Sequence, residues 1–160
     1  MKRNSRGFSL IELLIVVAII LIIAAIAIPN LLRSRIAANQ ASAVGSIRTL
    51  NTAQITYAST YNSGYSAQLI DLAPPAAAAP PTATAAGLID SVLAAGAKSG
   101  YTFTYVQGPV VNGRADTYTL NAAPTTVGTT GTNFYFSDES GVIRQDSTAA
   151  ATASSSPLAG

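Results

Sequence analysis

The sequence predicts an α+β protein, in which a long N-terminal helix, transmembrane and then amphipathic, packs on a small C-terminal antiparallel β-sheet. Three patterns support this prediction. An almost unbroken apolar run covers residues 8–28, apolar residues then recur at helical spacing to about residue 60, and a two-residue alternation follows residue 100. The chain beyond the apolar run, about 130 residues, suffices for one small globular domain.

A short basic segment, residues 1–7, precedes the apolar run and contains three basic residues and no acidic one. Because basic residues beside a membrane span tend to stay in the cytoplasm, we expect the N-terminus to face inward. The whole chain has nine basic and seven acidic residues, so without this segment six basic residues remain against seven acidic ones. Such a balance does not favour nucleic-acid binding, which needs a concentrated basic patch.

The apolar run of residues 8–28 is interrupted only by Ser9 and Glu12. As a helix it would be about 30 Å long, which is enough to cross the hydrocarbon core of a bilayer. A carboxylate in hydrocarbon costs several kcal/mol unless it is paired, so Glu12 predicts a functional role.

Two generic interpretations of this run are possible. It could be a secretory signal peptide, with residues 25–27 (Ala-Ile-Ala) as the small-residue cleavage site. Glu12 near its start and Pro29 just after that site count against a signal peptide. It could also be a plain signal anchor, in which Glu12 is tolerated near the membrane interface.

A third interpretation comes from a resemblance. Residues 7–16, GFSLIELLIV, resemble the prepilin cleavage and methylation motif of type IV pilins and type II secretion pseudopilins, and the similarity continues through residues 25–30. It covers about the first 55 residues closely. The resemblance implies a leader, residues 1–7, that a prepilin peptidase removes between Gly7 and Phe8, followed by N-methylation of Phe8. The helix then stays in the mature protein.

Cleavage at this place would create a cationic amine on Phe8, four residues before Glu12. We expect this amine to be the partner of the Glu12 carboxylate. The two groups could pair within one subunit or between neighbouring subunits, and only the second arrangement would help to set the register of a filament.

The helix is expected to cover residues 8–60. Its second half carries an apolar stripe that should pack on the sheet, formed by Ile36, Ala43 or Val44, Ile47, Leu50 or Asn51, Ile55 and Ala58. Pro29 lacks a backbone N–H and crowds the preceding turn, so a kink or local unwinding is expected there. Asn62 and Gly64 are stop signals for the helix.

Residues 61–99 are expected to form a connecting loop, with a helical turn at 66–72, an extended Ala/Pro-rich stretch at 73–86 and a short helix at 88–97. Residues 100–146 should form the antiparallel sheet. Its four short strands are centred on residues 101–106, 117–121, 134–137 and 142–145, with turns at 112–113 and 138–141. Residues 147–160 are rich in Ala, Ser and Thr, and a flexible tail is expected. This layout resembles the pilin fold.

Catalytic, cofactor-binding and metal sites are not predicted. The absence of Cys and His excludes thiol or imidazole catalysis and a Cys/His zinc site, and no nucleophile–base constellation indicates an enzyme. The acidic residues Asp138, Glu139 and Asp146 could bind calcium, but their spacing favours turn residues.

Other residues have a simple and a functional interpretation. Tyr57, Tyr61 and Tyr65 could form an aromatic track, although packing of the helix end on the sheet is the simpler interpretation. The serines of residues 154–156 could carry glycans or lie in a polar tail. Three arginines after the span could pair with acids on neighbouring subunits or keep the helix face hydrated; they are Arg33, Arg35 and Arg48.

The resemblance implies a structural subunit of a type IV pilus. Such a subunit is inserted once in the cytoplasmic membrane, processed by prepilin peptidase, passed to an inner-membrane assembly platform and polymerised with other copies into an extracellular pilus. A type II secretion pseudopilin or a minor pilin is the alternative within this class. A membrane-anchored adhesin or binding module is the alternative outside it.

Overall fold

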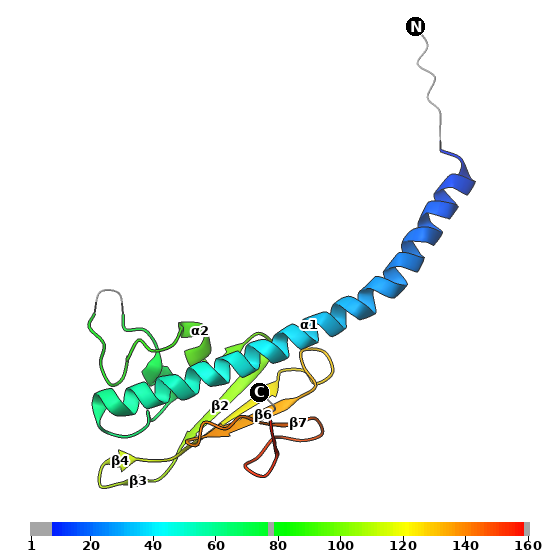
Figure 1. The fold of residues 1–160 in the computed structure, drawn as a ribbon. Coiled ribbons are helices and arrows are strands. Elements are labelled where there is room, and N and C mark those ends of the chain that lie inside the picture. Colours follow the sequence, from blue (N-terminus) through cyan, green and yellow to red (C-terminus); the bar gives the residue numbers. More distant parts are fainter. Residues whose placement is uncertain (1–7, 77–78, 159–160) are drawn as a thin grey trace. The chain divides into compact units, whose positions relative to one another are not determined.

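A computed structural model of the chain describes residues 8–76 and 79–158. Helix α1 extends over Leu10–Tyr61, close to the predicted bounds (Figure 1). The chain divides into two compact units, Met1–Arg35 and Ile36–Gly160, and α1 contributes to both.

The described part of the first unit is the beginning of α1. The helix is unbroken through Pro29, so the local unwinding that we considered at this residue does not occur. The fixed φ of proline is close to the helical value, and its ring removes only one hydrogen bond. A kink at Pro29 stays a prediction. Side chains of this unit are exposed almost throughout, including those of Leu10, Ile15 and Ile20.

In the second unit, one face of α1 packs against the sheet. The predicted positions Ala43, Ile47 and Leu50 are buried. The prediction for Ile55 is wrong, since 59% of this residue is exposed. Each helical residue advances the side chain by about 100°, so Ile55 lies about 140° around the helix from Leu50. The stripe is continued by other buried residues, which are Ala53, Gln54 and Tyr57.

The connection between α1 and the sheet contains the predicted helical turns, a 3-10 helix η1 at Leu69–Leu72 and a short α-helix α2 at Ser91–Ala94. Both are anchored in the core, where Leu72 and Leu93 are fully buried. Asp90 caps α2, because its carboxylate accepts a hydrogen bond from the Leu93 N–H at 2.9 Å. The N–H of Leu88 donates to the Leu72 carbonyl at 2.9 Å, which closes the Ala/Pro-rich stretch into a loop.

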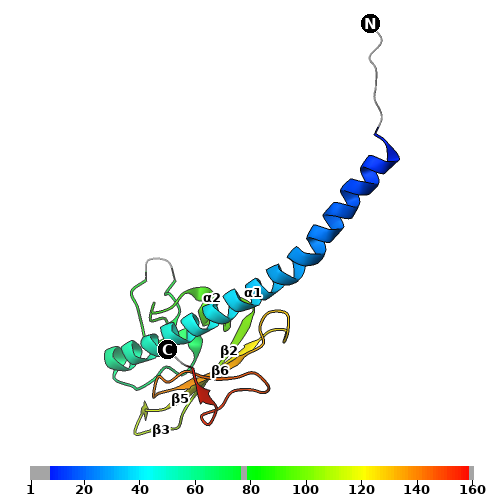
Figure 2. The same ribbon diagram turned by 45° about the vertical axis from the view of Figure 1, so that its right-hand side comes forward.

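The main sheet has six antiparallel strands in the order β1-β2-β5-β6-β7-β8. Figure 2 labels three of its central strands, β2, β5 and β6. The four predicted strands are its centre. The bounds are Ala97–Lys98 for β1, Tyr101–Gln107 for β2, Tyr118–Pro124 for β5, Phe134–Asp138 for β6, Arg144–Asp146 for β7 and Ser156–Pro157 for β8.

The turn at Asn112 and Gly113 differs from its prediction. It does not join the first two central strands directly, but closes a separate hairpin of β3 (Val110–Val111) and β4 (Arg114–Ala115) inserted between β2 and β5. The Ala115 N–H donates to the Ser63 carbonyl at 3.2 Å, and the Tyr65 N–H donates to the Ala115 carbonyl at 2.9 Å. These bonds attach β4 to the chain that leaves α1.

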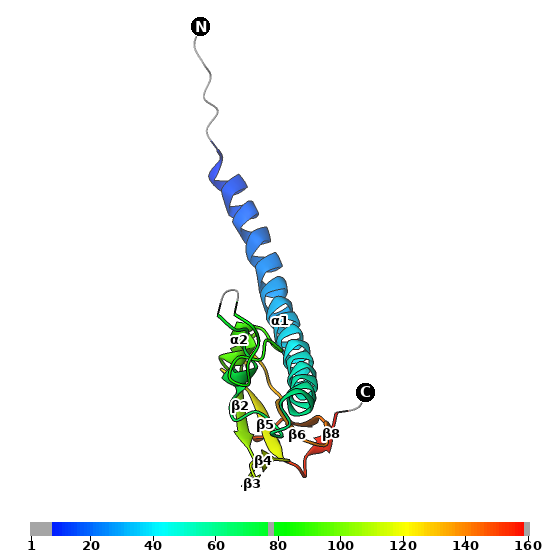
Figure 3. The same ribbon diagram turned by 90° about the vertical axis from the view of Figure 1, so that its left-hand side faces the viewer.

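Residues 147–158 do not form the frayed tail that their composition suggested. The chain turns back, and β8 pairs with β7 at the edge of the sheet (Figure 3). Arg144 Nη1 donates to the Ser155 carbonyl at 3.0 Å, and the Leu158 N–H donates to the Ile143 carbonyl at 2.8 Å. Ala151 is buried, so the loop is packed as well as hydrogen-bonded.

Candidate functional site

Ser9 and Glu12 cap the N-terminus of α1. The Ser9 N–H donates to Glu12 Oε2 at 2.9 Å, while Ser9 Oγ accepts from the Ile11 N–H at 3.4 Å. The Glu12 bond is that of a capping box, whereas the Ser9 hydroxyl accepts from the second residue of the helix and not from the third; both bonds satisfy backbone donors that a helix start leaves unpaired. Glu12 therefore has a partner before any cleavage. The Ser-x-x-Glu spacing was the sequence signal for this box, and our sequence interpretation missed it.

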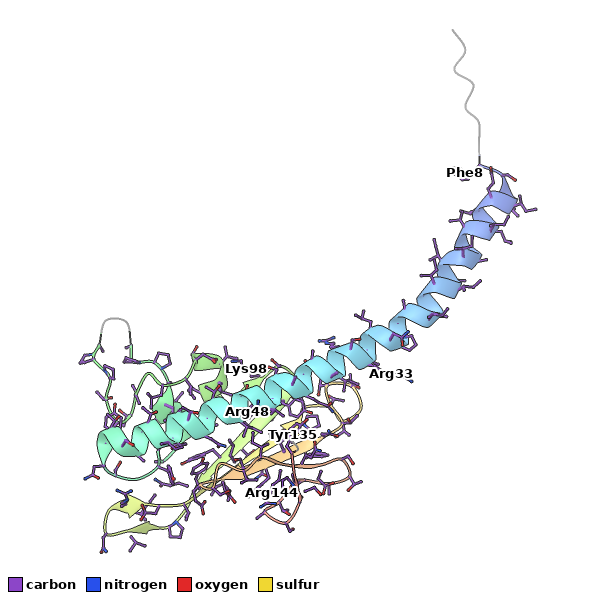
Figure 4. The ribbon with its side chains drawn as sticks, in the orientation of Figure 1. Phe8, Arg33, Arg48, Lys98, Tyr135 and Arg144 are labelled. Atoms are coloured by element: carbon purple, nitrogen blue, oxygen red, sulfur yellow. The ribbon has the colours of Figure 1, made fainter. Side chains whose placement is uncertain are left out.

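Phe8 lies just before the helix and is exposed (Figure 4). In the uncleaved chain its nitrogen is an amide, so the charge pair between a Phe8 amine and Glu12 does not exist. Gly7 lies outside the described residues. Cleavage between Gly7 and Phe8, methylation of Phe8 and the role of Glu12 in assembly stay predictions.

The first part of α1 is apolar on every side. Its large apolar side chains are exposed from Leu10 to Leu32, and the most apolar window, which is long enough to cross a membrane, contains no buried residue. A helix that is apolar all round is normally covered by other protein segments or by lipid. Within the described residues of this unit nothing covers it, so a lipid phase or other chains must do so.

Polar side chains fasten the second part of α1 to the rest of its unit. Asn51 Nδ2 donates to Ser137 Oγ at 2.8 Å, and Asn51 Oδ1 accepts from the Tyr118 hydroxyl at 3.0 Å. Gln54 Nε2 donates to Ser66 Oγ at 2.8 Å, and Gln54 Oε1 accepts from the Ser66 N–H at 3.0 Å. Unsatisfied buried polar groups are costly, so these bonds hold α1 in one register on the sheet.

The three tyrosines at and just after the end of α1 make the packing contacts of their simpler interpretation, and the aromatic track stays untested. Tyr57 is buried and packs against Tyr61, with ring centres 4.8 Å apart and ring planes tilted by 46°. Tyr65 meets Tyr118 of β5 edge-to-face at 4.7 Å. Such pairs stabilise packing, and burial raises the pKa of both Tyr57 and Tyr118 above the ordinary value.

Two of the three carboxylates considered for calcium, Asp138 and Asp146, accept hydrogen bonds within turns. Asp138 Oδ1 accepts from the Ser140 N–H at 3.0 Å, and Asp146 Oδ1 accepts from the Thr148 N–H at 2.9 Å and the Thr148 hydroxyl at 2.8 Å. These hydrogen bonds to Thr148 lower the pKa of Asp146. In the described part of the chain, no group of three acidic residues gathers that could hold a metal ion.

Known proteins are similar to part of this chain. Residues 2–28 match the family model of the prokaryotic N-terminal methylation motif. The chain is 68% identical over 37 residues to the type IV wide pilus major component PilA4 of Thermus thermophilus. This aligned stretch covers 23% of this chain and 28% of that protein. The chain is also 51% identical over 54 residues to the type IV major pilin protein PilA of Myxococcus xanthus. This second aligned stretch covers 34% of this chain and 24% of that protein.

The similarity to these curated relatives thus spans about a quarter of their own length. No solved structure matches the chain significantly. The family model ends at residue 28, so it includes much of the apolar beginning of α1 and none of the second unit.

Proposed function

Since the chain carries the N-terminal segment of the type IV pilin family, we propose that it is a structural subunit of a type IV pilus. The observation that supports this most is the beginning of α1, which is apolar on all sides and uncovered by the described residues of its unit. Packing of this segment among the same segments of other copies replaces lipid contact with close protein packing. The residues from Ile36 onward then form the outer surface of the filament.

Processing precedes assembly in this proposal. Prepilin peptidase cuts between Gly7 and Phe8 and methylates the Phe8 amine, while the chain spans the cytoplasmic membrane once. An inner-membrane platform then transfers it into the pilus at the cell surface. No catalytic or cofactor role is assigned to the chain itself.

Glu12 has the capacity for two tasks. An ionised carboxylate offers about four lone-pair sites, and the bond from the Ser9 N–H occupies one of them. The carboxylate is therefore able to keep the helix cap and still accept the cationic amine of Phe8 from a neighbouring subunit. The positive end of the helix dipole further favours a negative charge in this first turn.

Both relatives are named as major pilus components, which favours a major pilin over a minor pilin or a pseudopilin. Two measurements test the proposal. Mass spectrometry of the mature protein is expected to find a chain that begins at methylated Phe8, whereas a start at Ile28 would support a secretory signal peptide. Electron microscopy of sheared cell-surface material is expected to show filaments with this chain as the main component. A protein that stays monomeric in the membrane would support the anchored adhesin instead.

A further inference from the structure

We propose that an acidic turn of one copy docks into a groove on α1 of a second copy, a contact between the outer units of neighbouring subunits. The turn comprises Asp138–Gly141 and is called the Glu139 turn below. The groove is called the Arg48 groove and is lined by Arg48, Thr49, Thr52, Ala53, Thr56 and Leu88. This inference rests on the proposed function and adds the surfaces through which the outer units recognise each other.

The Arg48 groove has a volume of about 350 Å³ and small side chains along α1. The threonine hydroxyls donate to carbonyls one turn earlier in the same helix, from Thr49 to Gly45 at 3.1 Å and from Thr52 to Arg48 at 3.0 Å. Thr56 does the same to Thr52 at 3.0 Å. Because these hydroxyls are satisfied internally, the groove does not need further polar partners along its threonines. Arg48 is its one charged lining residue.

The charges of the second unit leave this cation without a partner. Lys98 pairs with Asp90 at 2.8 Å, and Arg114 pairs with Asp116. Among the described residues, the exposed side chains of Arg48 and Glu139 form neither an ion pair nor a hydrogen bond. One exposed cation and one exposed acid therefore remain, and their charges are complementary.

The Glu139 turn is pre-organised. The Gly141 N–H donates to the Asp138 carbonyl at 2.9 Å, and the Ser140 N–H donates to the Asp138 carboxylate at 3.0 Å. The Ser140 N–H and hydroxyl both engage Asp138 Oδ1, while the Glu139 carboxylate is exposed in the middle of the turn. A turn that is already ordered loses little conformational entropy when it docks.

The turn and the groove lie at different positions around α1. Asn51 Nδ2 donates to Ser137 Oγ and lies 3.5 Å from the Gly141 carbonyl, which places the turn on the Asn51 side. Around the helix, Arg48 lies about 60° from Asn51, and Ala53, at the far side of the groove, lies about 200° from it. In Figure 3 the connection with α2 and the edge with β8 lie on either side of α1.

Within one copy, Arg48 and Glu139 form no ion pair among the described residues. A contact between the turn of one copy and the groove of the next is heterologous, so each copy that joins offers a free groove or a free turn to the next copy. Where the rotation between copies does not close a ring, such a contact extends into an open-ended assembly, which is what a filament requires.

The absence of cysteine from the chain allows a direct test by disulfide trapping. Thr52→Cys and Glu139→Cys are combined in the full-length chain and produced in the cell that assembles it. Oxidised sheared filaments are expected to give a ladder of cross-linked multimers on non-reducing gels, since a disulfide needs Cα atoms within about 7 Å. The control pair, Thr52→Cys with Thr104→Cys on the exposed face of β2, is expected to give no ladder.

Filaments of the test pair that form without any ladder would overturn the docking contact and leave the proposed function intact. A lack of filaments from the unaltered chain would instead overturn the proposed function. If the cysteine pair itself blocks assembly, variants that reverse the charge of Arg48 or Glu139 test the docking contact instead. Arg48→Glu or Glu139→Arg alone is expected to reduce sheared filaments about fivefold, because an exposed ion pair contributes little energy.

The double reversal, Arg48→Glu with Glu139→Arg, is expected to restore the amount of filament. The mismatched pair, Arg48→Glu with Asp116→Arg, is expected to restore nothing, because Asp116 already pairs within its own copy. A double reversal that stays as low as either single variant would overturn the contact.

Discussion

Substitutions at Glu12 and Ser9 distinguish two roles of Glu12, its hydrogen bond in the helix cap and the negative charge that we propose to act in assembly. The Ser9 N–H donates to Glu12 Oε2 at 2.9 Å, and a glutamine side chain also offers an oxygen for this bond. Glu12→Gln therefore keeps the cap and removes the negative charge. Ser9→Ala is the matched variant, since it removes the side-chain half of the box and keeps the charge.

The two effects differ in size. Loss of an N-cap side chain costs about 1 kcal/mol, which corresponds to about a fivefold change in an equilibrium. Removal of one partner from a buried ion pair costs about 3 kcal/mol or more, which corresponds to more than about a hundredfold change. Glu12→Gln is thus expected to lower filament yield by about two orders of magnitude, and Ser9→Ala by only about fivefold.

The assay compares sheared filament with the subunit that stays in the membrane, by quantitative immunoblot of both fractions. Mass spectrometry on the membrane fraction establishes that each variant has been cleaved before assembly is scored. If processed Glu12→Gln assembles as well as the unaltered chain, the charge at this position has no part in recruitment, and the capping box alone explains the residue.

Three further predictions concern the second unit and use thermal or chemical unfolding of the full chain in detergent. Gly64→Ala places a Cβ against the Ala115 carbonyl oxygen at φ +78° and is expected to cost more than about 2 kcal/mol. Gly113→Ala has the same φ with open space around it and should cost about 1 kcal/mol, so equal losses would contradict the close approach at Gly64. Leu50→Ala is expected to cost about 2–5 kcal/mol, and Ile55→Ala, on the exposed face, less than about 0.5 kcal/mol; the reverse order would mean that α1 packs with another face. Burial raises the pKa of Tyr105 to about 12 from its ordinary value of 10.0, so the folded state keeps a proton that the unfolded state loses. Stability should therefore fall as the pH rises from about 10 to about 12, and Tyr105→Phe should reduce this fall.

Sequence patterns were sufficient to predict the elements whose formation depends on residues close together along the chain. The apolar run, the helical repeat and the alternation after residue 100 depend on spacing alone, and α1, β2, β5 and β6 lie close to their predicted places. The cap of α1 belongs to this group too. Its Ser-x-x-Glu signal is local, and it was present in the sequence although we did not use it.

Only the tertiary structure decided how distant segments meet. Ser156–Pro157 has no alternation of its own and becomes strand β8 because the free edge of β7 offers it backbone partners. The face of α1 that is buried depends on Ser66 and Ser137, which satisfy Gln54 and Asn51. Gly64 is needed because the Ala115 backbone passes directly beside it. Hydrogen-bond partners and close approaches of this kind are properties of the folded arrangement, so no pattern within a single segment predicts them.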